Sequence, residues 1–195
     1  MPGSVPPCTL VVPSLATLPS YRDALRRGWS SDNLRPQAGA EQLARAERDP
    51  HAFVAALDDP EGRGGPVTLP DGSVVPRLPG FRRWIWDGEV CGSIGFRWQK
   101  GGTALPPHVL GHIGYAVVPW KRGRGYARTA LGLLLAELRA AGMPAAGLTH
   151  VELTTDPGNP ASQRVITGNG GYPVERFAKL DAYGGGETLR FRIDL

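Results

Sequence analysis

A glycine- and arginine-rich stretch, Val117–Ala127, holds the residues best suited to chemistry; it reads VVPWKRGRGYA. A β-rich segment enters a tight turn and leaves it as an amphipathic helix. A helix N-terminus has unpaired N–H groups and a positive dipole end, and both attract anions. Gly123 and Gly125 let a phosphate approach the backbone closely, and Arg122 and Arg124 add positive charge. The pattern predicts an anion site, although an ordinary strand–helix connection with solvated arginines also fits it.

Three other motifs fit the chain less well. A nucleoside-triphosphate loop requires Gly-Lys-Ser/Thr, and no lysine in this chain follows a glycine. The dinucleotide-binding fingerprint requires a third glycine at the position of Arg128. The segment Gly92–Gly95 resembles a serine-hydrolase elbow, but Cys91 stands where that motif has its first glycine.

Two titratable side chains at the ends of expected strands are candidates for moving a proton. His112 is close to the start of a strand expected over Gly111–Val118, and imidazole titrates near neutrality. Asp156 directly follows a strand expected over Leu148–Thr155 and is a second candidate base. Each has a structural alternative, since a histidine in a strand is often a packing or surface residue and a loop aspartate often binds nearby N–H groups.

Other titratable pairs are weaker candidates. His150 and Glu152 lie on one face of the same expected strand, because strand side chains alternate with period two. His108 and His112 flank a loop as two metal ligands would, but no third ligand accompanies them. No metal site is predicted.

These residues need strands and helices to position them. Apolar and β-rich segments predict strands, and the apolar spacing from Ala127 to Ala141 predicts the helix after the glycine-rich turn. Asp87-Gly88 predicts a hairpin turn, and Asn159-Pro160 caps and opens a short helix. Strands are expected over Leu10–Val12, Phe81–Trp86, Val90–Trp98, Gly111–Val118, Leu148–Thr155, Tyr172–Phe177 and Thr188–Ile193. Helices are expected over Tyr21–Trp29, His51–Leu57, Ala127–Ala141 and Pro160–Thr167, and Gly62–Gly80 is expected to be a long connection.

The composition is that of a folded protein about the size of one domain. The chain has 195 residues, of which 41% are hydrophobic and 21% charged, so its many glycines and prolines belong to loops. The two cysteines, Cys8 and Cys91, are too few for a disulfide framework. No signal peptide is indicated, and the most membrane-like run, Ala130–Ala136, is far shorter than the ~20 residues that a membrane span needs. We expect a soluble, cytoplasmic protein without a membrane partner.

Positive charge is concentrated in the middle of the chain. The formal net charge is +4, and the segment Arg77–Arg128 alone carries an excess of positive over negative residues larger than this. Such a field favours an anionic partner: a phosphate, an acidic substrate or a nucleic acid. The charge alone does not distinguish among these three kinds of partner.

Two motifs in fixed order resemble those of one family. Arg122-x-x-Gly125-x-Ala127, after a strand ending in Val117-Val118-Pro119, looks like the coenzyme-A pyrophosphate loop of the GNAT superfamily, the acyl-CoA-dependent N-acetyltransferases. The second motif is a strand followed by Asn159, a short helix, and Gly170-Gly171-Tyr172. The chain resembles a subgroup of bacterial acetyltransferases with unassigned substrates.

The resemblance implies a mixed α/β fold. Its central, mostly antiparallel sheet of six to seven strands is splayed in the middle and flanked by about four helices. One acetyltransferase domain would cover residues 1–195, with 1–80 as a variable substrate-side part and 81–195 as the acyl-CoA-binding core. The splay would lie between the strands at Gly111–Val118 and Leu148–Thr155.

The resemblance also implies acetyl-CoA as the acyl-donor cosubstrate, with no metal. The pantetheine arm would extend the strand at Gly111–Val118 through backbone hydrogen bonds, and the amide of Asn159 would bind the arm. A backbone N–H of that strand would stabilise the oxyanion. The residues expected to bind the donor are Val117, Val118, Arg122, Gly123, Arg124, Gly125, Tyr126, Ala127, Asn159 and Ser162.

The implied reaction is direct acetyl transfer to an amine in a ternary complex. It needs a base for the ammonium proton, for which His112 is the first candidate and Asp156 the second. Many relatives place a tyrosine that acts as the general acid about seven residues after the asparagine, but here that residue is Ile166. Tyr115 and Tyr172 remain as substitutes.

Two other functions stay open at this stage. The missing tyrosine allows a non-catalytic acyl-CoA-binding module on the same fold, and the basic stretch allows a nucleic-acid-binding protein. We expect an enzyme without a nucleic-acid partner. Its acceptor would be a small-molecule or peptide amine, and relatives are often homodimers.

Overall fold

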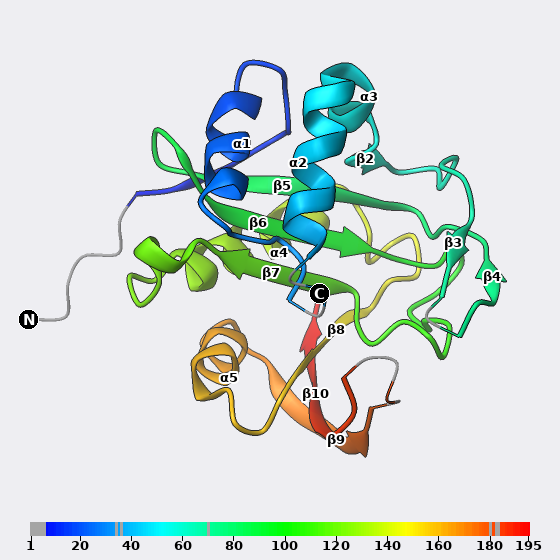
Figure 1. The fold of residues 1–195 in the computed structure, drawn as a ribbon. Helices are drawn as coiled ribbons and strands as arrows, with labels where there is room; N and C mark the ends of the chain where they lie inside the picture. The colour runs from blue at the N-terminus through cyan, green and yellow to red at the C-terminus, as the bar shows by residue number, and fades with distance from the viewer. Residues whose placement is uncertain (1–6, 34, 36, 70, 180, 182–183) are drawn as a thin grey trace, which may run out of the picture.

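The computed structural model describes residues 7–33, 35, 37–69, 71–179, 181 and 184–195. Its larger sheet is antiparallel throughout and has the strand order β1-β5-β6-β7, with β2 pairing with β5 beside this path (Figure 1). The strands are β1 (Thr9–Val11), β2 (Asp58–Asp59), β5 (Gly80–Trp86), β6 (Val90–Arg97) and β7 (Ile113–Val117).

A second antiparallel sheet has the order β8-β10-β9 and continues below the first in Figure 1. Its strands are β8 (His150–Thr155), β9 (Tyr172–Ala178) and β10 (Glu187–Asp194). A small separate hairpin is formed by β3 (Val67–Thr68) and β4 (Val74–Val75).

Helices cover both faces of the larger sheet. Three of them, α1 (Leu18–Arg26), α2 (Ala38–Arg48) and α3 (Pro50–Ala55), lie over one face, and α4 (Tyr126–Ala140) lies on the other (Figure 1). A fifth helix, α5 (Pro160–Thr167), lies beside β8. None of the described helices is long and apolar enough to cross a membrane.

Strand alternation divides the core between these two faces. Trp84 on β5 stacks against Tyr21 of α1 with ring centroids 4.5 Å apart, whereas its neighbour Ile85 joins the cluster that contains Leu131 and Leu134 of α4. Because successive side chains of a strand point to opposite faces, one strand supplies both cores.

Local sequence determines several element ends. Gly88 has φ +110° in the hairpin turn between β5 and β6, a conformation that glycine adopts without strain. The side chain of Asn159 accepts a hydrogen bond from the Ser162 N–H (3.0 Å) and thereby caps α5. Asp49 caps α3 in the same way through the Ala52 N–H (2.9 Å).

The two sheets meet at one point and then separate. The N–H of His112, just before β7, donates to the Glu152 carbonyl of β8 (2.8 Å), and the Glu152 N–H donates to Nδ1 of His112 (2.9 Å). Among the described residues, no backbone hydrogen bond joins the rest of β7 to β8. The sheet splayed between these strands is therefore confirmed, together with the mixed α/β fold and its antiparallel strands.

The predicted framework differs from the structure mainly in the first 80 residues. The segment 38–48 forms the α2 helix, which was not expected. The long connection before β5 contains the β3–β4 hairpin. The expected elements from Phe81 onward are all present, and their ends shift by only a few residues.

Candidate functional site

The glycine-rich stretch forms a loop that leads directly into α4. Gly123 (φ +75°) and Gly125 (φ +89°) are both left-handed, and Gly125 is the residue that precedes the helix. The first intrahelical bond runs from the Thr129 N–H to the Gly125 carbonyl (3.1 Å). Within the described part of the chain, no acceptor pairs with any N–H from Gly123 to Arg128. Successive free N–H groups at a helix N-terminus form an anion site.

Three arginines surround this loop and differ in what they bind. Arg122 donates from Nε to the Val117 carbonyl (3.1 Å), which folds the loop back onto the end of β7. Arg128 donates to the Gly168 carbonyl (3.3 Å). Arg124 is exposed and has no partner among the described side chains, so its charge remains available to an anion.

A buried polar cluster lies beneath the loop. Lys121 immediately precedes Arg122, and its Nζ lies 2.8 Å from Oδ1 of Asp87 and 2.7 Å from Glu89. Tyr126, the first residue of α4, donates its hydroxyl to Oδ2 of Asp87. Burial raises the pKa of Asp87, but hydrogen bonds from Lys121 and Tyr126 outweigh it and hold the pKa at about 2. One carboxylate therefore anchors both ends of the loop.

The free edge of β7 presents alternate residues to the gap between the sheets. The Val118 N–H donates to the Cys91 carbonyl of β6 (2.9 Å), and its carbonyl accepts from the Lys121 N–H (3.0 Å). Because N–H and C=O groups alternate sides along a strand, those of Val117 and Tyr115 point away from β6, toward the gap. The Val117 N–H is thus placed as expected for a ligand along this edge, whereas its carbonyl already accepts from Arg122 and both backbone groups of Val118 are bonded.

Side chains cross the gap further along. Tyr115 reaches from β7 to α5, where its hydroxyl lies 2.8 Å from Oγ of Ser162. Burial raises the pKa of this phenol, so it stays protonated at neutral pH. Asn159 uses Oδ1 for the helix cap, and its Nδ2 has no partner among the described residues. The amide of Asn159 is therefore able to act both as a cap and as a donor to a ligand.

Asn33 contacts the same edge of β7. This residue lies in the connection between α1 and α2, and its Nδ2 donates to the Tyr115 carbonyl (2.8 Å). The contact joins residues far apart in the sequence, and no motif in residues 1–80 indicated it. It brings the α1–α2 connection to the open edge of β7.

His112 is the joint between the two sheets. Its ring is fully buried, Nδ1 accepts from the Glu152 N–H, and Nε2 donates to the Thr103 carbonyl (3.0 Å). Burial lowers the pKa of this imidazole to about 4. Both ring nitrogens are occupied, so this arrangement gives His112 a structural role and leaves no lone pair facing the gap.

Asp156 lies at the open end of β8 and is exposed. Its Oδ1 pairs with Nζ of Lys179 (2.7 Å), and its Oδ2 has no partner in the described structure. Of the two predicted bases, Asp156 is the one with a free oxygen.

His150 and Glu152 share a strand face as expected, but Glu152 is bound by Arg192 (3.0 Å) and Arg190 (3.5 Å).

The remaining candidate acids are placed differently from Tyr115. Ile166 is buried in the core on α5 and offers no hydroxyl. Tyr172 on β9 is exposed and donates to the Asp194 carboxylate (3.2 Å), outside the gap. No group of three His, Cys, Asp or Glu side chains able to hold a metal occurs among the residues that the structure describes.

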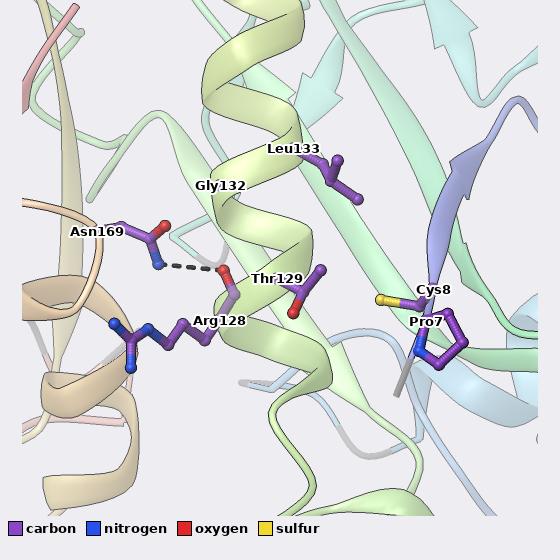
Figure 2. A pocket seen from close by; sticks show the side chains of 7 residues that line it. All are labelled: Pro7, Cys8, Arg128, Thr129, Gly132, Leu133 and Asn169. Atoms are coloured by element: carbon purple, nitrogen blue, oxygen red, sulfur yellow. Dashed lines mark hydrogen bonds between the residues drawn. The ribbon is translucent and has the colours of Figure 1, made fainter. Parts of the chain in front are cut away.

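A hollow beside α4 lies outside this arrangement. Figure 2 shows it between Cys8 near β1 and Asn169 after α5, with Gly132 facing it from the helix. The Asn169 side chain donates to the Arg128 carbonyl (3.1 Å) and is thereby fixed. None of the predicted site residues lines the hollow, and burial raises the pKa of the Cys8 thiol that does line it.

The loop, the edge of β7 and the start of α5 therefore form one continuous surface. Its loop end has unpaired N–H groups of the kind that bind anions, its middle offers the Val117 N–H to an extended ligand, and its far side holds a protonated phenol. Such an arrangement suits a long ligand that ends in phosphates.

Comparison with known proteins agrees with this geometry. A family model described as Acetyltransferase (GNAT) domain matches residues 74–171, just over half of the chain. No curated protein matches the sequence significantly.

Solved structures resemble this one over nearly the whole chain. One is the microcin C7 self-immunity acetyltransferase MccE in complex with acetyl-CoA and AMP (TM-score 0.62, 10% identity, covering 96% of this chain and 92% of that one). Another is RimL, the ribosomal L7/L12 α-N-protein acetyltransferase, in complex with coenzyme A (0.61, 14%, 96% and 94%). A third is a spermidine N-acetyltransferase SpeG chimera from Vibrio cholerae and hSSAT (0.53, 12%, 96% and 95%). At these identities, the likeness shows the fold.

Proposed function

Because the chain belongs to the GNAT acetyltransferase family, we propose that it transfers an acetyl group from acetyl-CoA to a primary amine on a small molecule or peptide. The proposed route is direct transfer in a ternary complex, within one domain over residues 1–195. The observation that carries it is the run of unpaired N–H groups from Gly123 to Arg128, at the end of a strand whose Val117 edge faces an open gap.

The residues present fit acetyl-CoA, which supplies the activated acyl thioester. The N–H groups of the loop and the free charge of Arg124 would hold the pyrophosphate. The Val117 backbone and Nδ2 of Asn159 would bind the pantetheine arm along the edge of β7. A backbone N–H that faces the gap would stabilise the oxyanion as the amine adds to the thioester carbonyl.

Proton transfer needs two groups. We assign the acid role to Tyr115, because its phenol lies in the gap and replaces the hydroxyl absent at Ile166. Asp156 is the proposed base, since Oδ2 is free at the open end of β8. His112 was the first candidate from the sequence; its occupied nitrogens support a positioning role instead.

The direct test measures thiol release from acetyl-CoA with a panel of amines, and coenzyme A binding by calorimetry. The proposed enzyme binds coenzyme A and releases thiol only when an acceptor is present. Binding without acceptor-dependent thiol release would instead establish the non-catalytic acyl-CoA-binding module that Ile166 makes conceivable. Failure to bind coenzyme A would overturn both.

A further inference from the structure

Two arginines lie side by side on the α1–α2 face of the larger sheet, at the opposite end of β7 from the glycine-rich loop. Arg82 on β5 pairs in register with Gly95 of β6, and Arg97 is the next residue of β6 on that face. Diagonal neighbours on adjacent antiparallel strands are about 7–8 Å apart. Desolvation by nearby protein atoms, and then the charge of Arg82, lower the pKa of the Arg97 guanidinium.

Neither guanidinium forms a close ion pair with a carboxylate among the described residues, although the charge of Asp32 acts on Arg97. In contrast, Arg83 on the opposite face pairs with Glu137 (2.7 Å) and Asp58 (3.4 Å). The carboxylate that acts on Arg97 is Asp32, which already pairs with Arg35 (3.4 Å). Two adjacent positive charges repel each other, and an anion between them would relieve that repulsion.

Missing side chains leave space that the two arginines border, since a Cβ at Gly95 would meet Cγ of Arg82 at 3.5 Å. Gly95 pairs with Gly114 on β7, so two successive strands lack a side chain at this level of the face. A Cβ added at Gly114 would meet only Nη2 of Arg97, at 3.9 Å. Gly114 is exposed, so the space is open to solvent.

The next level of the same face holds further unpaired donors. Trp84 and Ser93 pair across β5 and β6, both side chains are buried, and Nε1 of Trp84 and Oγ of Ser93 have no partner. Buried polar groups are normally hydrogen-bonded. Trp84 is packed against Tyr21 and does not reach solvent. Guanidinium N–H groups only donate, so the wall formed by Arg82 and Arg97 suits a ligand group rich in acceptors.

This wall adjoins the reaction gap. Tyr115 follows Gly114 directly, and its carbonyl is bound by Asn33 from the α1–α2 connection. From Gly114 to Val117 the strand rises about 10 Å. A donor with its phosphates on the loop would extend its acyl end along β7 toward this wall.

From this arrangement we infer that Arg82 and Arg97 form an acceptor subsite, and that the acceptor is an amine carrying a carboxylate or phosphate group. The inference rests on the proposed acetyl transfer and adds the substrate class. The anionic group lies between the two guanidiniums over Gly95 and Gly114, and its amine points toward the gap beside Tyr115.

The test compares amines matched in length. δ-Aminovalerate is paired with pentylamine and cadaverine, and O-phosphoethanolamine with ethanolamine, which separates carboxylate from phosphate. We expect kcat/KM to favour the anionic member by at least ~10-fold, as for a charge-assisted hydrogen bond. Arg82→Gln and Arg97→Gln each lower kcat/KM for the anionic amine much more than for its neutral partner, and so abolish that preference. Arg48→Gln, an exposed arginine at the end of α2, keeps the wild-type preference.

A binding measurement separates this inference from the proposed function. Calorimetric titration of the coenzyme-A-saturated protein with δ-aminovalerate or O-phosphoethanolamine needs no turnover, and melting temperatures verify that each variant is folded. Anion binding that depends on the two arginines supports the subsite even if no amine releases thiol. The absence of thiol release would then overturn acetyl transfer but not the subsite. Acetylation with equal or greater preference for neutral or dicationic amines, or anion binding unchanged in both variants, overturns the subsite.

Discussion

The carboxylate of Asp87 binds the residue just before the glycine-rich loop and the residue at its end. Lys121 and Tyr126 both donate to it, from positions on either side of the free N–H groups. The side chain of Asp87 is only 18% exposed. Loss of its charge would leave Lys121 buried with Glu89 alone and would release Tyr126.

We therefore predict that Asp87→Asn weakens coenzyme A binding by ~10-fold, because the loop loses its anchor. The substitution should lower the free energy of unfolding by about 1–2 kcal/mol. At saturating acetyl-CoA, kcat should change little, since the loop touches the phosphates and not the reacting carbon. Calorimetry and steady-state kinetics measure both, with Asp23→Asn on the exposed side of α1 as the control. An unchanged affinity would show that the loop keeps its shape without Asp87.

The Tyr115 phenol spans the gap, where we propose that it gives a proton to the leaving thiolate. Tyr115→Phe removes the hydroxyl and its bond to Ser162 but keeps the ring. We expect kcat to fall by ~10²-fold, with coenzyme A affinity within about twofold of wild type because the proposed donor contacts are made by backbone N–H groups and Asn159, not by this phenol. Tyr172→Phe, outside the gap, is the matched control. Equal kcat for wild type and Tyr115→Phe would exclude this residue as the acid.

At the scale of elements, the junction between the loop and α4 depends on backbone conformation. Gly125 has φ +89°, and any L side chain there costs about 1–2 kcal/mol. Gly125→Ala should therefore shift the loop and weaken coenzyme A binding far more than binding of pantetheine, which lacks the phosphates. Gly72→Ala, at φ +83° in the β3–β4 hairpin, incurs the same strain away from the site. Equal weakening of both ligands would place the pyrophosphate elsewhere.

The local sequence predicts much of the junction between the loop and α4. The glycines of the loop, the apolar spacing of α4 and the Asn159 cap depend on residues within one or two turns, and the structure has all three. The splay between β7 and β8 came from the family resemblance, and the structure shows the strands parting after His112.

Other parts of the site depend on contacts between distant segments. Asp87 lies 34 residues before Lys121, and Asn33 lies 82 before Tyr115, so no local pattern identifies either pairing. The backbone orientation of Val118 follows from the register of β6 against β7, which sequence does not give. The helix α2 lacks a capping side chain, which explains why it escaped prediction.

At the scale of the whole molecule, the basic stretch does not form one continuous surface. Lys121 is buried against Asp87, Arg83 pairs with Glu137, and Arg122 is folded onto Val117. The free charges separate into the glycine-rich loop at one end of β7 and the Arg82–Arg97 pair at the other. As proposed sites, these two would suit a phosphorylated donor and an anionic acceptor, whereas a nucleic-acid strand needs a continuous basic track.

The stability of the whole fold should fall in two steps as the pH decreases. Burial holds the pKa of His112 at about 4, below the ~6.5 of a free imidazole, so between these values the unfolded chain binds a proton that the folded one rejects. Across that window the free energy of unfolding falls by about 3 kcal/mol. Burial lowers the pKa of His150 as well, so this residue acts in the same direction. Asp87, held at about 2, adds about 1–2 kcal/mol more between pH ~4 and ~2.

His112→Gln tests the first of these steps. Because the variant carries no imidazole at the joint, its free energy of unfolding should be lower than that of wild type at pH 7.5, but it should depend much less on pH between 7 and 4.5. His51→Gln, on the exposed side of α3, should keep the wild-type slope. Urea unfolding at several pH values measures both. A His112→Gln slope equal to that of wild type would mean that the buried imidazole does not control acid stability.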